Sequence, residues 1–261
     1  MATQGSVVGS GAKPFDVILF DLGNTLLYFE GDWGEVLAEQ NRVLSHCLAD
    51  MGCQFDVDTF AAYYKAWMDA YFSARDVQTT EIPAEKLLRT AIDQFGHAPI
   101  SNESVLSALN CSFAVSEAHW KLEADAIPML TTLAQQGYRL GLVSNANYGP
   151  NVHHLLEMND LKHHFETIVI SAEVGVRKPG THIFEVALDA MHCRPESAVM
   201  IGDRLDWDVI GAHNAGLAAI WITRRVEKKA GVMDDPAGPE RPDATIERLE
   251  ELPSLLTHWK K

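Results

Sequence analysis

The sequence is poor in cysteine and in basic residues, and it has no long hydrophobic run. It holds four cysteines among 261 residues, and 21 lysines and arginines stand against 36 aspartates and glutamates, a formal net charge of −15. No apolar run approaches the roughly 18 residues that predict a membrane span. Proteins neutralise nucleic-acid phosphates and anionic lipid surfaces with lysine and arginine, so this charge disfavours both. We therefore expect no nucleic acid and no membrane among its partners.

The cysteines are scattered and form no motif. Cys47, Cys53, Cys111 and Cys193 include no close pair of the kind that binds zinc or cycles as a disulfide. We expect four reduced cysteines and a cytoplasmic protein. The first 14 residues are small and polar and lack the apolar stretch of a secretory signal, which indicates a flexible leader over residues 1–14.

Short apolar runs that end in small or polar residues predict a buried sheet. The composition, 47% hydrophobic and 22% charged, is that of an ordinary globular protein. Strands alternate with helical patterns, which predicts an α/β fold with a Rossmann-like parallel sheet core and helices on both faces. The predicted strands are residues 17–20, 138–144, 167–171, 198–203 and 218–223, and the helices between them are residues 129–136, 151–158, 181–191 and 207–215. A Pro- and acid-rich stretch, residues 234–243, predicts a surface loop before a last strand-like piece and a short helix.

Residues 30–121 have a different character and offer no convincing buried strand. Three helical patterns run through them: one stopped by Gly52, one with an aromatic stripe, and one opened by Pro83. We interpret the segment as an inserted α-helical cap domain over 30–121, with the core made of 15–29 and 122–261. The stripe is expected to form the core of this helical bundle and consists of Phe60, Tyr64, Trp67 and Tyr71.

Polar residues converge where the predicted strands end. Ligands of parallel sheets bind beyond the carboxyl ends of the strands, and Asp21, Ser144 and Asp203 all lie there. Carboxylates that face one another across such a crevice repel, and oxygen ligands of this kind suit Mg²⁺. A nearby lysine, Lys178, and the Ser144 hydroxyl suit the charge of a phosphoryl group. The pattern indicates phosphate chemistry assisted by a divalent cation.

Four motifs resemble those of the haloacid dehalogenase superfamily of hydrolases. Residues 20–26, FDLGNTL, are similar to its first motif, and Ser144-Asn145-Ala146 to its second. Lys178-Pro179 resembles the third motif, and Ile201-Gly202-Asp203 with Asp208 resembles the fourth. The helical insertion between the first and second motifs matches the commonest cap of the family. The resemblance covers essentially the whole chain after residue 14 and implies the phosphatase-like branch.

The resemblance implies a nucleophile and a metal site. Asp21 would attack phosphorus and form an aspartyl-phosphate, which divides the reaction into two easier displacements. Mg²⁺ would be held by the Asp21 carboxylate, the Gly23 backbone carbonyl and Asp203, with Asp208 helping directly or through water. We expect a small phosphorylated metabolite as substrate and a monomer or homodimer as the assembly.

The remaining motif residues would bind the substrate or support the nucleophile. Ser144 and Lys178 would hold phosphoryl oxygens, and Lys178 would also neutralise charge in the transition state. The Thr25 hydroxyl would steady the nucleophile loop, and the Asn145 amide could assist there.

Gly23 departs from the pattern that the resemblance implies. Phosphatases of the family carry a second aspartate two residues after the nucleophile, where it donates and accepts protons. Positioned acid–base catalysis is typically worth ~10²–10⁴ in rate, so three alternatives stay open. In the first, the chain is a phosphatase that takes the proton from the cap, the substrate or water, and Glu30 and Asp32 are the candidate residues. In the second, it is a catalytically weak or inactive ligand-binding protein on the same scaffold.

The third alternative is a hydrolase that cleaves a carbon–halogen or a carbon–phosphorus bond. Dehalogenases of the family also lack the second aspartate, but they need no Mg²⁺. A carbon–phosphorus hydrolase would need a Schiff-base lysine in the cap, for which Lys65 and Lys86 are the candidates.

Overall fold

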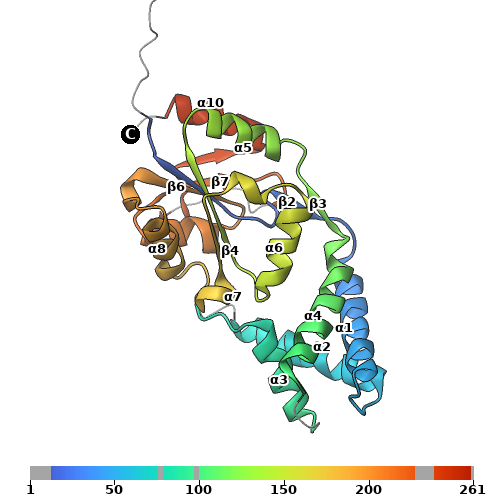
Figure 1. Ribbon diagram of the computed structural model, residues 1–261. Helices are drawn as coiled ribbons and strands as arrows, with labels where there is room; N and C mark the ends of the chain where they lie inside the picture. The colour runs from blue at the N-terminus through green and yellow to red at the C-terminus, as the bar shows by residue number, and fades with distance from the viewer. Residues whose placement is uncertain (1–12, 76–78, 97–99, 227–237, 260–261) are drawn as a thin grey trace, which may run out of the picture.

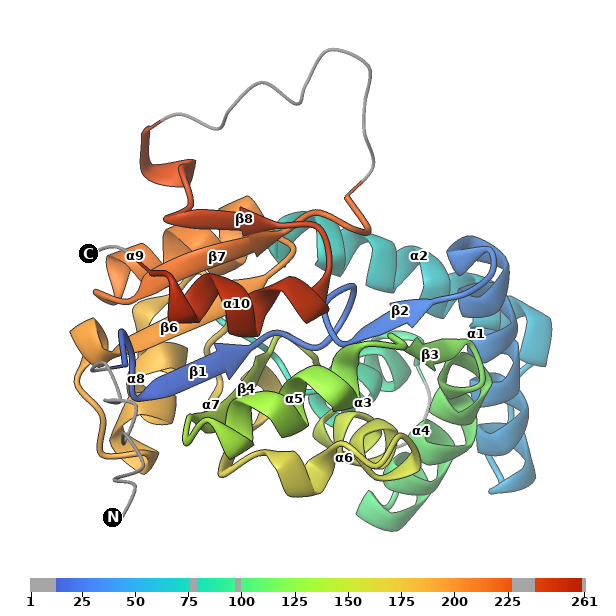
Figure 2. The ribbon, with the colours of Figure 1, turned by 90° about the horizontal axis from the view of Figure 1, so that it is seen from above.

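The computed structural model describes residues 13–75, 79–96, 100–226 and 238–259, and residues 1–12 of the predicted leader and 234–237 of the predicted loop lie outside these ranges. Six parallel strands form one sheet in the order β5-β4-β1-β6-β7-β8 (Figures 1 and 2). Their bounds are β1 Val17–Phe20, β4 Arg139–Ser144, β5 Thr167–Ile170, β6 Ala198–Gly202, β7 Ala218–Ile222 and β8 Ala244–Ile246. The predicted α/β fold class is confirmed.

Helices cover both faces of the sheet. In β1, Ile18 and Phe20 point into one apolar cluster and Val17 and Leu19 into another, because side chains of a strand alternate between faces. The first cluster is closed by α5 (Ala126–Gln135), α6 (Gly149–Met158) and α10 (Leu252–Thr257), of which α5 and α10 lie in front of the sheet in Figure 2. The second is closed by α8 (Thr181–Ala190) and α9 (Ile210–Asn214). Burial on both faces explains why the strands read as unbroken apolar runs.

Short elements complete the core. Ser171, predicted as a strand end, instead begins α7 (Ser171–Val174), and the predicted helix 207–215 is divided between a π turn and α9. The π turn is η3 (Leu205–Val209), and the 3-10 turns are η1 (Lys162–His164), η2 (Pro195–Ser197), η4 (Gly238–Glu240) and η5 (Leu249–Glu251). In the described ranges no helix combines the length and apolar character needed to cross a bilayer.

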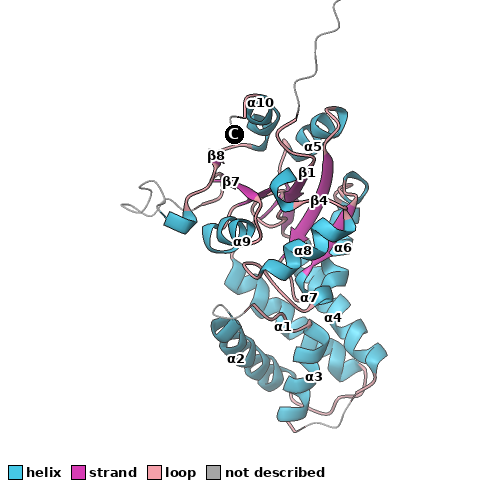
Figure 3. Cartoon of the chain, turned by 90° about the vertical axis from the view of Figure 1, so that its left-hand side faces the viewer, coloured by secondary structure: helices cyan, strands magenta, loops and turns pink. Residues whose placement is uncertain are grey.

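Four helices make up a cap at one end of the sheet (Figures 1 and 3). They are α1 (Trp33–Asp50), α2 (Val57–Arg75), α3 (Ala84–Gln94) and α4 (Asn102–Glu117), and they enclose an apolar cluster of their own. The sequence predicted the first three but not α4. Phe60 and Tyr64 of the aromatic stripe are buried in this cluster, and Trp67 and Tyr71 pack against it half-buried. The predicted domain bounds stay a prediction.

Two features of the cap were not anticipated. An antiparallel ribbon joins the cap to the core, formed by β2 (Leu27–Phe29) and β3 (Trp120–Leu122), with Phe29 opposite Trp120. The packing of α1 against α4 brings Cys47 and Cys111 together in a disulfide, although 64 residues separate them. The expectation of four reduced cysteines is therefore wrong for this pair, while Cys53 and Cys193 are free thiols.

Candidate active site

Three carboxylates meet at the carboxyl ends of neighbouring strands. β1 and β6 lie side by side, so Asp21 and Asp203, which directly follow them, reach the same edge of the sheet. The Asp21 backbone N–H donates to the Ile201 carbonyl at 2.9 Å, which extends the pairing up to the nucleophile position. Asp208 comes from the π turn η3, and carboxylate oxygens of the three residues lie within 4.8 Å of one another. The structure thus brings together the carboxylates that the sequence analysis selected.

Gly202 makes room for Asp208. A Cβ atom at position 202 would lie 2.2 Å from Asp208 Cγ, a separation that no side chain can occupy. The Arg204 backbone N–H donates to Asp208 Oδ2 at 3.0 Å and fixes its direction. At the end of β6, Gly202 therefore leaves space for Asp208, and Asp203 adds a carboxylate to the cluster.

Lys178 ties two of the carboxylates together. Its Nζ donates to Asp21 Oδ1 at 2.6 Å and to the Val143 carbonyl at 2.8 Å, and it lies 2.6 Å from Asp208 Oδ1. The lysine side chain is only 1% exposed. Burial opposes its charge, yet the pKa of Lys178 is raised because the carboxylates of Asp208 and Asp21 touch it. The ammonium is therefore held charged and aimed at the nucleophile position.

The other predicted substrate-binding residues differ in their surroundings. The Asn145 amide donates to the Lys178 carbonyl at 3.0 Å and accepts from the Lys178 backbone N–H at 2.8 Å, so it positions the lysine loop. Ser144 is buried at the end of β4, next to the Val143 carbonyl that Lys178 contacts. The buried Thr25 hydroxyl has no hydrogen-bond partner in the described part of the chain, so the structure shows no contact through which it steadies the loop.

The charge of this cluster suits a divalent cation. One lysine faces three carboxylates; burial, with the charges of Asp21 and Asp208, raises the pKa of Asp203 to about 8. Burial also raises the pKa of Asp208, to about 6. A bound cation removes this repulsion, and an all-oxygen donor set fits a hard ion. Asp21, Asp203 and Asp208 are the residues that would hold it, and the Gly23 carbonyl stays a predicted fourth ligand.

Comparison with known proteins identifies the family. A family model of haloacid dehalogenase-like hydrolases matches residues 15–216. The chain belongs to this family. It is 36% identical over 144 residues to a glyceraldehyde 3-phosphate phosphatase from Methanopyrus kandleri, a match that spans 55% of this chain and 60% of that relative. It is 27% identical over 252 residues to a ribulose-1,5-bisphosphate 5-phosphatase from Halopiger xanaduensis, covering 92% of this chain and 98% of the relative.

Solved structures share the fold. A 2-haloacid dehalogenase from Pseudomonas syringae superposes with a TM-score of 0.63 at 23% identity, over 94% of this chain and 100% of that one. A phosphatase of the family from Thermococcus onnurineus gives 0.60 at 23% identity, over 92% and 97%. The family resemblance read from the four motifs is confirmed.

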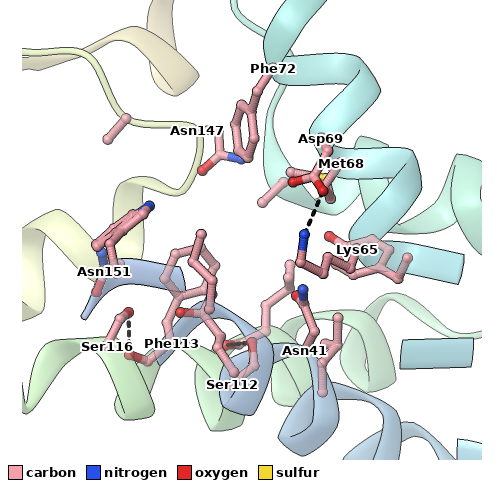
Figure 4. Close-up of a pocket in the computed structure, with 18 of the residues that line it drawn as sticks. Asn41, Lys65, Met68, Asp69, Phe72, Ser112, Phe113, Ser116, Asn147 and Asn151 are labelled. Atoms are coloured by element: carbon pink, nitrogen blue, oxygen red, sulfur yellow. Dashed lines mark hydrogen bonds and ion pairs between the residues drawn. The ribbon is translucent and has the colours of Figure 1, made fainter. Parts of the chain in front are cut away.

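A cavity of about 650 Å³ lies between the cap and the core (Figure 4). Its lining includes Asn145 and Arg204, which directly follow Ser144 and Asp203 in the chain. Asn145 and Trp207 line it from the core, and Trp120 lines it from the ribbon. Trp120 also lies beside Gly23, where a Cβ atom would meet the indole Cη2 at 3.4 Å, an ordinary contact. The backbone at Gly23 is not left-handed, so a side chain there is possible.

The candidates for the missing proton donor lie elsewhere. Glu30 and Asp32 are absent from the described lining of the cavity, and Asp32 caps α1 by accepting from the Glu35 backbone N–H at 2.8 Å. Lys65 lines the cavity from α2 and pairs with Asp69 at 2.6 Å, whereas Lys86 is not among the lining residues.

A buried glutamate of the cap, Glu81, contacts the loop that carries Lys178. It accepts from the Ser171 hydroxyl at 3.0 Å and lies 3.7 Å from the guanidinium Nε of Arg177, the residue before Lys178. Both side chains are at most 1% exposed. The backbone of the same segments is also paired, with the Arg177 N–H donating to the Thr79 carbonyl at 2.7 Å. Sequence reasoning missed Glu81 because it stands in a short polar connection with no periodic pattern.

Removal of Glu81 is expected to destabilise this hydrolase strongly. Glu81→Ala removes the carboxylate that lies 3.7 Å from the buried Arg177 guanidinium, and breaking a buried ion pair costs about 3–5 kcal/mol. Denaturant unfolding measures the loss, with Glu103→Ala, an exposed glutamate of the cap, as control. A loss for Glu81→Ala no larger than that of the control would contradict the buried pair.

The metal-free protein is expected to lose stability as the pH rises. Asp203 binds its proton more tightly in the folded state than in the unfolded chain, where its pKa is about 3.9, so its contribution to the free energy of unfolding falls between pH 5 and 8. Asp203→Asn removes this titration. In chelator, the variant should gain on the wild type by about 1 kcal/mol per pH unit from pH 5 to 7. If the free energy of unfolding changes equally with pH in the wild type and the variant, the pKa of Asp203 is not raised in the folded state.

Proposed function

We propose that this chain is an Mg²⁺-dependent phosphatase of small phosphorylated metabolites that works through an aspartyl-phosphate on Asp21. The single observation that carries the proposal is the buried Lys178 ammonium 2.6 Å from Asp21, within the same cluster as Asp203 and Asp208. A nucleophile, a fixed cation and a cluster of three carboxylates at one strand edge suit phosphoryl transfer, which depends mainly on positioning and charge neutralisation. Relatives in the family carry the names of phosphatases for small metabolites, such as phosphoserine phosphatase from Thermus thermophilus.

In this proposal the Asp21 carboxylate attacks phosphorus from the side opposite the leaving oxygen. A bond forms between Asp21 and phosphorus, and the bond to the alcohol oxygen breaks with its electron pair on that oxygen. Lys178 and Ser144 hold the equatorial phosphoryl oxygens as charge develops on them. Water then attacks the aspartyl-phosphate, releases inorganic phosphate and restores Asp21. The divalent ion, when bound, supplies further neutralisation of the phosphoryl charge.

The alternatives are less well supported. A carbon–halogen hydrolase makes no use of three crowded carboxylates. A Schiff-base mechanism needs a lysine amine free to attack a carbonyl, and the Lys65 amine is paired with Asp69 at 2.6 Å. A protein that only bound a ligand would gain no stability from these buried charges. Burying an ion costs free energy unless close partners of opposite charge compensate for the lost hydration.

Mg²⁺ is expected to raise the melting temperature, because a ligand that binds only the folded state stabilises it. At about 100 times the dissociation constant the gain is about 2.7 kcal/mol, or roughly 5–10 °C for a chain of this size. Asp203→Asn should lose most of the shift. Asp206→Asn is the matched control, since Asp206 is half exposed and pairs with Arg204 outside the cluster. An equal response in both variants would locate the ion elsewhere.

Gly23→Asp is expected to restore proton transfer. Without an acid at position 23 the leaving oxygen departs with its charge, so the wild type should hydrolyse activated aryl phosphates far faster than alkyl phosphates. The variant should speed alkyl ester hydrolysis at least ~10-fold and change aryl rates little. Gly23→Asn, of equal size but unable to donate a proton as an acid, is the control, and initial rates with Mg²⁺ are the measurement. Equal wild-type rates on both esters would mean that another group supplies the proton.

A further inference from the structure

The cavity beside the nucleophile is lined by aromatic rings on the side that faces the ribbon and the cap. Trp120 and Trp33 line it from the ribbon and the start of α1. Phe113 lines it from α4 (Figure 4). In the proposed reaction this is the space for the alcohol part of the substrate, because the phosphoryl group sits among Asp21, Ser144 and Lys178. Aromatic walls favour a flat, apolar-faced group over a flexible chain of hydroxyls.

Trp120 stands at the junction of the cavity and the nucleophile loop. Its indole lies next to Gly23, two residues from Asp21, where a Cβ atom would be 3.4 Å away. The ring is held in place by edge contacts with Phe29 at 5.4 Å and Trp33 at 6.2 Å, and those two rings pack at 4.5 Å. A ring attached directly to the ester oxygen would therefore emerge from the phosphoryl site against a preorganised aromatic surface.

The cavity has no spare cation for a second acidic group. Among the described residues that line it, the cations are Lys65, Arg75 and Arg204, and each is paired with a carboxylate. Arg204 also stacks on Trp207 at 4.2 Å. A second phosphate or a carboxylate on the substrate would have to compete with Asp69, Glu81 or Asp206 for one of these cations, which disfavours it relative to an uncharged group. The lining selects an uncharged leaving group.

Carboxamides on the cavity wall offer hydrogen bonds to such a group. Gln40 Oε1 and Asn151 Oδ1 are buried in the lining and have no hydrogen-bond partner in the part of the chain that the structure describes. Buried acceptors without a donor are costly, so a ligand that carries N–H or O–H groups gains by satisfying them.

We propose that the substrates are aryl phosphate monoesters: the ester oxygen is bonded to an uncharged planar ring, which packs on Trp120 and carries hydrogen-bond donors. This inference rests on the proposed phosphatase function and deepens it. The overall reaction converts the aryl phosphate and water into a phenol and inorganic phosphate. A phenol ionises at a pKa of about 10, as tyrosine does, so the phenolate leaves without help from an acid and then takes a proton from water. The absent acid at Gly23 and the aromatic wall beside it thus point to the same leaving group.

Inert phosphonates test the substrate class apart from catalysis. With Mg²⁺, calorimetry on the full chain should find phenylphosphonate bound about 10-fold more tightly than methylphosphonate, since stacked aromatic contacts are worth roughly that factor. 3-Phosphonopropionate, which adds a carboxylate, should bind no better than methylphosphonate. Equal affinities for the phenyl and methyl compounds, or tighter binding of the carboxylate, overturn the inference and leave the phosphatase proposal standing.

A variant of Trp120 tests where the aromatic ring of the ligand binds. Trp120→Leu should reduce the preference for phenylphosphonate to within about twofold and leave methylphosphonate affinity unchanged. Trp67→Leu, which removes a cap tryptophan outside the described lining, should change neither. A phenyl preference retained in folded Trp120→Leu contradicts the placement. If the wild type binds neither phosphonates nor inorganic phosphate and hydrolyses no ester, the phosphatase proposal fails and the substrate class fails with it.

Discussion

The ion pairs of Lys178 are the contacts on which the site depends. A lysine ammonium with almost no exposure has to be compensated, and it is compensated by Asp21, Asp208 and one backbone carbonyl. The same contacts leave Asp203 as the carboxylate without a comparable cation, which is why its pKa is raised by burial and by its two neighbours. This imbalance supports the proposal that the site binds a divalent ion.

Most of the surrounding structure serves to bring these charges together. Parallel pairing of β1 with β6 delivers two aspartates to one edge, and Gly202 clears the space into which Asp208 turns. Asn145 bonds both backbone groups of Lys178 and so fixes the loop that presents the ammonium. The positioning groups are thus backbone amides, a glycine and a carboxamide, all of them neutral. The charged side chains therefore remain available for the proposed substrate and ion.

The sequence predicted the parts that have a strong local signal. Strands buried on both faces, such as β1, read as unbroken apolar runs, and the residues after them could be assigned to one edge without any knowledge of distances. Helix α4 was missed because several serines and an asparagine interrupt its apolar pattern, and β2 and β3 because three-residue strands carry almost no pattern. Trp120 lies beside Gly23 and Glu81 lies beside Arg177, and both neighbours are distant in the chain. A hydrophobic pattern along the sequence does not predict contacts of this kind. The pairing of Cys47 with Cys111 depends in the same way on how two helices pack.

The cap is joined to the core by covalent and by noncovalent connections. The ribbon of β2 and β3 is a pair of covalent connections, whereas the segment around Glu81 is held only by noncovalent contacts with residues 171–177. If the cap moved about the ribbon, the buried contact between Glu81 and Arg177 would break and water would reach both charges. Arg177 directly precedes Lys178, so the contacts of the cap also bear on the segment that carries this lysine.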